Sequence, residues 1–208
     1  MLQPPFVCKS LKANPLNKRI IIRPSICIGL CISLFLLPVS WVFAWLAAVM
    51  IHEAGHLLAM RIMNIPIRSI SIDLKGAIIE AGYFSPAEEF ICALAGPVAG
   101  LGCLLVAAHF PLLAVCGLVQ STYNLLPFPD YDGGRILMLT LCRFLTRNKA
   151  EAVYRLILLT ASVLLLLFGL FTWFILHLGP MFLFVCIIPV VKSGVIKIPC
   201  KQSEQIVQ

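Results

Sequence analysis

The chain has 208 residues, of which 61% are hydrophobic and only 12% are charged. A soluble domain of this length cannot bury so much apolar surface, so the composition excludes a soluble globular protein and predicts a polytopic membrane protein. The net charge of +7 comes from lysines and arginines in short segments between apolar runs. That distribution is typical of loops that set membrane topology, and we expect no nucleic acid partner.

The apolar pattern predicts an all-α membrane protein with about six transmembrane helices, at 20–37, 39–62, 87–109, 111–126, 153–176 and 178–192. The first segment is interpreted either as a full span or as one arm of a re-entrant hairpin. We divide the chain into a basic leader (1–19), an integral membrane domain (20–192, with a core at 39–135) and a tail (193–208). With both termini in the cytosol, all sixteen lysines and arginines fall on the cytosolic side of the cell membrane.

The second predicted span contains His52-Glu53-Ala54-Gly55-His56. Residues four apart share one face of a helix, so both imidazoles can reach one zinc ion, with Glu53 beside them as general base. A carboxylate inside a membrane span is costly, and a metal ion offsets that cost. The topology puts His52 close to the cytosolic end of its span, so we expect the site near the cytosolic face.

Apolar and polar residues alternate over 69–75, between the second and third predicted spans, and a short apolar run follows Gly76. Period-two alternation across a glycine predicts a small β-hairpin at the membrane surface. We interpret this hairpin either as a structural flap or as an exposed edge to which an extended substrate adds as a strand.

The third predicted span begins at Ser85-Pro86-Ala87-Glu88, a sequence that predicts a capping box with proline at the first helical position. Further along, Gly96 and Gly100 form a small-x-x-x-small pattern. This pattern predicts close packing of the span against its neighbours.

Zinc needs three protein ligands and one open position for water if it is to hydrolyse a substrate. A metzincin would supply a third histidine six residues after His56, but Ile62 stands there. The two other histidines, His109 and His177, fall at the opposite membrane face. The residues therefore leave three carboxylates as candidates for the third ligand: Glu80, Asp130 and Asp132.

Two prolines and two glycines interrupt the apolar pattern in the segment 124–134, Asn-Leu-Leu-Pro-Phe-Pro-Asp-Tyr-Asp-Gly-Gly. Together with the His52 motif and Gly96-Pro97, this segment resembles the site-2 protease family of intramembrane zinc metalloproteases. The likeness is greatest to the compact sporulation-type branch that processes pro-sigma-K.

The family's motif has the form N-x-x-P-x-x-x-x-D-G, which Asn124, Pro127, Asp132 and Gly133 match. The resemblance implies that Asp132 is the third zinc ligand and that Asn124 and Pro127 position the substrate. An amide at position 124 is equally suited to capping the broken helix. Asp130 stands where the family usually has proline, so its role stays open.

The resemblance implies a zinc metalloendopeptidase, with one Zn²⁺ per chain, that cleaves a membrane-tethered protein in regulated intramembrane proteolysis. A zinc-activated water would attack the peptide bond, and Glu53 would carry its proton to the departing amine. The alternatives are a catalytically silent zinc-binding scaffold or chaperone of the same fold, and a metal transporter. A transporter is disfavoured because the candidate ligands converge on one site.

The length of the chain also bears on regulation. With 208 residues allotted to six spans and short loops, we expect no appended regulatory domain. Control is then expected from a regulatory membrane protein partner, from substrate presentation or from a prior cut by another protease.

Overall fold

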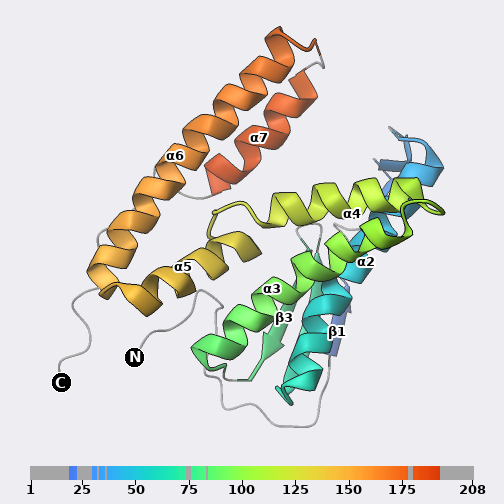
Figure 1. Ribbon diagram of the computed structural model, residues 1–208. Coiled ribbons are helices and arrows are strands. Elements are labelled where there is room, and N and C mark those ends of the chain that lie inside the picture. Colours follow the sequence, from blue (N-terminus) through green and yellow to red (C-terminus); the bar gives the residue numbers. More distant parts are fainter. Residues whose placement is uncertain are drawn as a thin grey trace. The chain divides into compact units, whose positions relative to one another are not determined.

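The computed structural model describes residues 19–22, 30–31, 33–35, 37–73, 76–82, 84–177 and 180–192 (Figure 1). The chain divides into two compact units, residues 1–126 and 127–208, and each is considered by itself. The predicted leader, apart from Arg19, and the predicted tail lie outside the described residues.

Three helices pack together in the first unit. They are α2 (Val39–Ile62), α3 (Pro86–Gly102) and α4 (Pro111–Asn124), and the short 3-10 helix η1 (Cys103–Val106) continues α3. Each of the three long helices contacts the other two. Proline occupies the first position of α3 and of α4, where its missing N–H leaves no intrahelical bond unmade.

The predicted capping box is present at the start of α3. The Ser85 hydroxyl oxygen accepts a hydrogen bond from the Glu88 N–H at 3.3 Å, and the Glu88 carboxylate accepts one from the Ser85 N–H at 2.7 Å. Two backbone donors that a helix start leaves unbonded are thereby satisfied, and the first residue of α3 is fixed.

Glycines set the distance between these helices. A Cβ on Gly55 of α2 would lie 2.6 Å from the Ala95 carbonyl oxygen of α3, and one on Gly117 of α4 would lie 2.6 Å from the Gly100 carbonyl oxygen of α3. Both distances are too short for any real Cβ, so α3 approaches its two neighbours at points where only glycine fits. The close packing predicted from Gly96 and Gly100 is confirmed for this part of the chain.

A left-handed residue ends α2 and leads into the sheet. Asn64 has a φ of 56°, a conformation that asparagine tolerates, and the Ile65 N–H donates to the Met60 carbonyl oxygen at 2.9 Å. Met60 and Ile65 are both buried at this point. Around them pack the partly buried residues Leu57, Met63, Ile67, Phe84 and Cys92.

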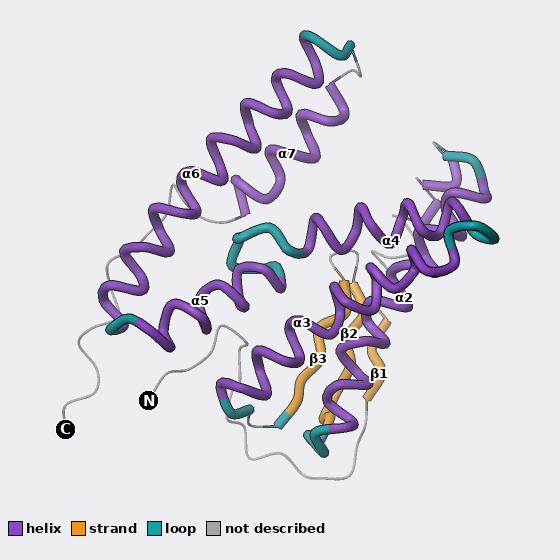
Figure 2. The backbone as a smooth tube through the Cα atoms, viewed as in Figure 1, coloured by secondary structure: helices purple, strands orange, loops and turns teal. Residues whose placement is uncertain are grey.

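Three strands form one small sheet in the order β1-β2-β3, and they lie side by side in Figure 2. Their bounds are Arg19–Ile22, Ile67–Asp73 and Gly76–Ala81. The strands β2 and β3 pair antiparallel between α2 and α3, with Asp73 opposite Gly76, where the alternating pattern predicts a hairpin. Both β1 and β3 are edge strands of this sheet.

The strand β1 corrects the sequence interpretation. The apolar pattern assigns residues 20–22 to the start of the first membrane span, but Ile20 to Ile22 extend alongside β2, with Ile20 opposite Ile70 in a parallel pair. Three consecutive β-branched residues favour an extended backbone, and an available strand supplies the hydrogen-bond partners.

The second unit consists of α5 (Asp132–Phe144), α6 (Arg147–Phe174) and α7 (Pro180–Lys192). The helix α6 packs against both α5 and α7. The apolar pattern predicts no helix where α5 lies, because its apolar residues occupy one side of a short segment that also carries Asp132, Arg135 and Arg143.

Three helical segments of the described chain are long and apolar enough to cross a membrane: α2, the continuous segment Pro86–Val106, and α6. The helices α4 and α7 have 14 and 13 residues, fewer than the roughly 20 that a full span needs. By length and composition the described residues thus provide three spans, and the six-span arrangement stays a prediction.

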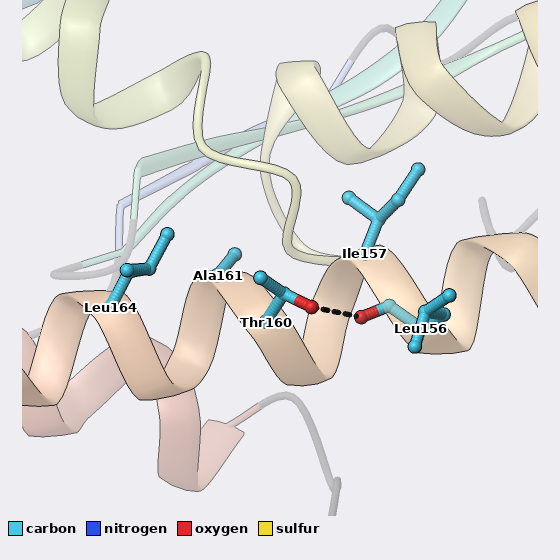
Figure 3. A pocket seen from close by; sticks show the side chains of 5 residues that line it. All are labelled: Leu156, Ile157, Thr160, Ala161 and Leu164. Atoms are coloured by element: carbon cyan, nitrogen blue, oxygen red, sulfur yellow. Dashed lines mark hydrogen bonds between the residues drawn. The ribbon is translucent and has the colours of Figure 1, made fainter.

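The surface of α6 has a shallow apolar hollow, lined by Leu156, Ile157, Thr160, Ala161 and Leu164 (Figure 3). The one hydroxyl in this lining, that of Thr160, donates to the Leu156 carbonyl oxygen at 3.0 Å. The hydroxyl hydrogen in this hollow is therefore already bonded. A surface of this kind is suited to contact with hydrocarbon.

Candidate metal centre

Two histidines on α2 bring their ring nitrogens together. The Nε2 atoms of His52 and His56 are 3.2 Å apart, and the two rings meet edge to face with centroids 4.9 Å apart. Two nitrogens that each lie 2.0–2.1 Å from a tetrahedral zinc ion are about 3.3 Å from one another. The pair is therefore spaced as two ligands of one zinc ion.

The ring of His56 is oriented by α3. Its Nδ1 lies 2.8 Å from the Cys92 carbonyl oxygen, which can only accept, so Nδ1 carries the proton and donates it. The Nε2 atom of His56 consequently offers a lone pair on the side of His52. A carbonyl behind a metal-binding histidine is the usual means of fixing its tautomer and ring orientation.

Gly96 of α3 provides the space for this ring. A Cβ built at Gly96 would overlap the imidazole of His56 at Nε2, Cε1 and Cδ2. The ring thus lies directly against the helix backbone. The glycine-proline pair of the third predicted span therefore has a local role here, because any larger residue at position 96 would displace His56.

The ring of His52 is almost wholly enclosed, with 2% of its surface exposed. The side-chain nitrogen of Asn124, the last residue of α4, is 3.5 Å from its Nε2 atom. At the end of α4 the Leu125 N–H already donates to the Ser121 carbonyl oxygen at 3.0 Å. The amide of Asn124 thus lies beside the Nε2 atom of His52, and its role in substrate positioning or in helix capping stays a prediction.

Asp132 is the first residue of α5 and is buried. The loop before it is tightly folded, because Phe128 is 1% exposed and a Cβ on Gly134 would overlap the Phe128 carbonyl oxygen. Asp130, in the same loop, is exposed. The two carboxylates of this segment therefore lie in different environments.

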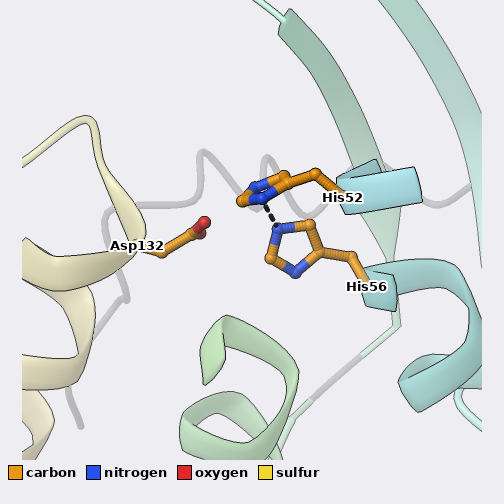
Figure 4. A group of neighbouring side chains, drawn as sticks. All are labelled: His52, His56 and Asp132. Atoms are coloured by element: carbon orange, nitrogen blue, oxygen red, sulfur yellow. Dashed lines mark hydrogen bonds between the residues drawn. The ribbon is translucent and has the colours of Figure 1, made fainter. Parts of the chain in front are cut away.

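His52, His56 and Asp132 are the described side chains that could together hold a metal ion, and Figure 4 draws them. Two imidazole nitrogens and a carboxylate oxygen are a donor set that zinc uses in hydrolytic sites, with a fourth position open to water. The residues present therefore fit a zinc ion. Asp130 is not in this group, and the side chain of Glu80 lies outside the described residues.

Two further candidate residues, Glu53 and Pro127, are close in sequence to the members of this group. Glu53 is half-buried on α2 between the two histidines, and Pro127 is half-buried three residues after the end of α4. Their roles as base and as positioning residue stay predictions. The role of the Cys92 carbonyl could not be predicted from the sequence, because every residue has a backbone carbonyl and a sequence motif specifies only side chains.

Comparison with known proteins agrees with this geometry. No protein-family model matches the chain. Over 107 residues it is 31% identical to the Synechocystis sp. (strain ATCC 27184 / PCC 6803 / Kazusa) protein named "Putative zinc metalloprotease sll0528". That match includes 44% of this chain and 28% of the relative, so the chain spans little more than a quarter of that protein's length.

Among solved structures, the chain is similar to the site-2 protease from Methanocaldococcus jannaschii. The TM-score is 0.56 at 20% sequence identity, and the superposition covers 91% of this chain and 94% of the other. The resemblance indicated by the three motifs is confirmed: the chain has the fold of a site-2 protease. Its placement in the sporulation-type branch stays a prediction.

Proposed function

We propose that the chain is an intramembrane zinc metalloprotease of the site-2 protease family, which cleaves a membrane-tethered protein substrate. The observation that carries the proposal is the 3.2 Å separation of the His52 and His56 Nε2 atoms on a helix that is apolar enough to cross a membrane. A buried histidine pair at ligand spacing in such a helix is costly unless it binds a metal ion or another functional partner.

Zinc would be held by Nε2 of His52, Nε2 of His56 and a carboxylate oxygen of Asp132. When bound, zinc lowers the pKa of its water to about 7 and polarises the carbonyl of a bound peptide. The Glu53 carboxylate takes the proton from the attacking water and delivers it to the departing amine nitrogen. The Asn124 amide, 3.5 Å from the His52 Nε2 atom, would donate a hydrogen bond to the substrate backbone.

The same proposal places the site near the cytosolic face. His52 precedes the end of α2 at Ile62 by about 15 Å at 1.5 Å per residue, and Arg61 lies in the last turn. Arginine at a helix end marks the cytosolic side under the positive-inside rule. We therefore propose a multi-pass protein of the cell membrane with both termini in the cytosol, in which water reaches the site from the cytosol.

A substrate helix must unwind before its peptide bonds can react, and the sheet offers a place for the unwound strand. The strand β3 is at an edge of the three-stranded sheet, so its outer side is available for pairing in the described part of the chain. We propose that an extended substrate segment adds to this edge through backbone hydrogen bonds.

The test compares N-terminal peptide profiles of cells that express the native chain or Glu53→Gln. Glutamine keeps the shape of the side chain but cannot take up the proton, so new termini near membrane segments are expected only with the native chain. The control is Glu151→Gln, which removes an exposed ion pair of 2.9 Å with Arg147 on α6 and is expected to leave the native profile unchanged.

Identical profiles for the native chain and Glu53→Gln, at equal expression and equal zinc content, would count against the protease. They would instead indicate a catalytically silent zinc-binding scaffold or chaperone of the same fold. Loss of zinc from Glu53→Gln would show that Glu53 acts as a ligand and not as the base.

A further inference from the structure

We propose that Ser121 of α4 is a positioning residue for His52. With zinc bound, its hydroxyl oxygen would accept a hydrogen bond from Nδ1–H of His52, and this bond would keep the Nε2 atom of that ring directed at the metal. This inference rests on the proposed function, because it takes His52 to be a zinc ligand. It concerns the side of the ring that faces away from the metal.

The hydroxyl of Ser121 differs from four other helical hydroxyls in the described part of the chain. Ser121 has no exposed surface, and its oxygen has no hydrogen-bond partner among the described residues. Other hydroxyls in these helices donate to the carbonyl oxygen four residues earlier, as Ser162 does to Leu158 at 2.7 Å. The same holds for Thr122, Thr140 and Thr160. A buried hydroxyl outside this pattern needs a specific explanation.

Gly100 of α3 shows where the Ser121 oxygen lies. A Cβ built at Gly100 would overlap that oxygen, and the same point is 3.7 Å from Nδ1 of His52. The hydroxyl oxygen and the Nδ1 edge of the ring therefore border one small space, which exists because residue 100 has no side chain. The three helices that carry these residues all contact one another.

The chemistry of a zinc-binding histidine explains why a hydroxyl lies there. A neutral imidazole that binds metal through Nε2 carries its proton on Nδ1 and donates it to an acceptor. For His56 that acceptor is the Cys92 carbonyl oxygen, at 2.8 Å. A serine oxygen has two lone pairs and can accept this hydrogen bond from His52. Each histidine of the pair would then have its own acceptor.

The test measures the zinc dissociation constant of the purified full chain in nanodiscs by competition with a chelator. Ser121→Ala is expected to weaken zinc binding by about 10–100-fold, the range found when such supporting contacts are removed. Ser162→Ala is the matched control, because it removes a buried serine hydroxyl that bonds only within α6. It is expected to bind zinc as the native chain does.

Gln120 is an alternative acceptor for the Nδ1–H of His52, so it is tested with a variant of its own. The side-chain oxygen of Gln120 is also buried and has no hydrogen-bond partner among the described residues. Gln120→Leu is expected to leave zinc affinity unchanged. A loss with Gln120→Leu and none with Ser121→Ala would overturn the assignment to Ser121.

A double variant separates positioning from a general structural effect. If Ser121 acts through His52, adding Ser121→Ala to His52→Ala should change the already weakened zinc affinity by less than about twofold. An equal loss in both backgrounds would contradict the inference. In ¹⁵N-histidine NMR spectra of the zinc-loaded chain, the His52 Nδ1–H proton should move upfield in Ser121→Ala and not in Ser162→Ala.

The outcomes distinguish this inference from the proposed function. A native chain that binds no zinc would overturn both. A native chain that binds zinc with the same affinity as Ser121→Ala would overturn the role of Ser121 alone.

Discussion

The imidazole of His56 is confined on two sides by α3, and this confinement orients one nitrogen of the candidate metal centre. Its Nδ1 atom donates to the Cys92 carbonyl oxygen, and its ring lies against the backbone at Gly96. The sequence predicts the two histidines as ligands through their spacing of four residues. It does not reveal how the His56 ring is held, because the Cys92 carbonyl is a backbone atom and the Gly96-Pro97 pair does not indicate which side chain packs against it.

The space at Gly96 leads to a prediction about zinc binding. In Gly96→Ala the added methyl group would overlap the His56 ring and displace it, so we expect zinc affinity to fall by about 10–100-fold. Gly102→Ala is a matched control on the same helix, since a Cβ there meets no atom within 4 Å. Equal zinc affinity of the two variants, measured by chelator competition, would show that the His56 ring does not depend on this contact.

The third ligand can be tested at the two neighbouring carboxylates. Asp132→Ala should weaken zinc binding by more than about tenfold, because losing a direct ligand costs at least as much as losing a supporting contact. Asp130→Ala should not, because Asp130 is exposed and outside the group. Zinc content of the two purified variants decides between them, and the reverse order would assign the metal to Asp130.

Among the secondary-structure elements, α3 determines how the helices of the first unit come together. Its backbone meets α2 at Gly55 and α4 at Gly117, and it supplies the Cys92 carbonyl and the Gly96 backbone that the His56 ring contacts. The sequence predicts this helix well, since its capping box and its small-x-x-x-small pattern are local signals. It predicts β1 and α5 poorly. Ile20 to Ile22 pair with a strand 50 residues away, and α5 is too short for a membrane span.

The crossing of α3 and α4 leads to a prediction about stability. A methyl group at Gly117 would lie 2.6 Å from the Gly100 carbonyl oxygen, so Gly117→Ala must push the two helices apart. We expect the free energy of unfolding to fall by about 1–3 kcal/mol, the usual cost of overpacking. Unfolding in detergent against Gly102→Ala measures this difference, and a Gly117→Ala chain as stable as the control would contradict the crossing described here.

On the scale of the whole molecule, the order of the motifs is what the sequence predicts most directly. The His52 motif, the Gly96-Pro97 pair and the segment from Asn124 to Gly133 all fall within residues 52–133, and the fold is that of a site-2 protease. The number of spans stays a prediction. The apolar pattern predicts membrane spans at α4 and α7. These helices have 14 and 13 residues, fewer than the roughly 20 that a full span needs.

The central claim is that His52, His56 and Asp132 hold one zinc ion. The most direct measurement is the zinc content of the purified full chain together with its zinc X-ray absorption spectrum. The account predicts one zinc per chain with nitrogen and oxygen ligands at about 2.0–2.2 Å. A chain that retains no zinc, or a spectrum with sulfur ligands at about 2.3 Å from any of the nine cysteines, would contradict it.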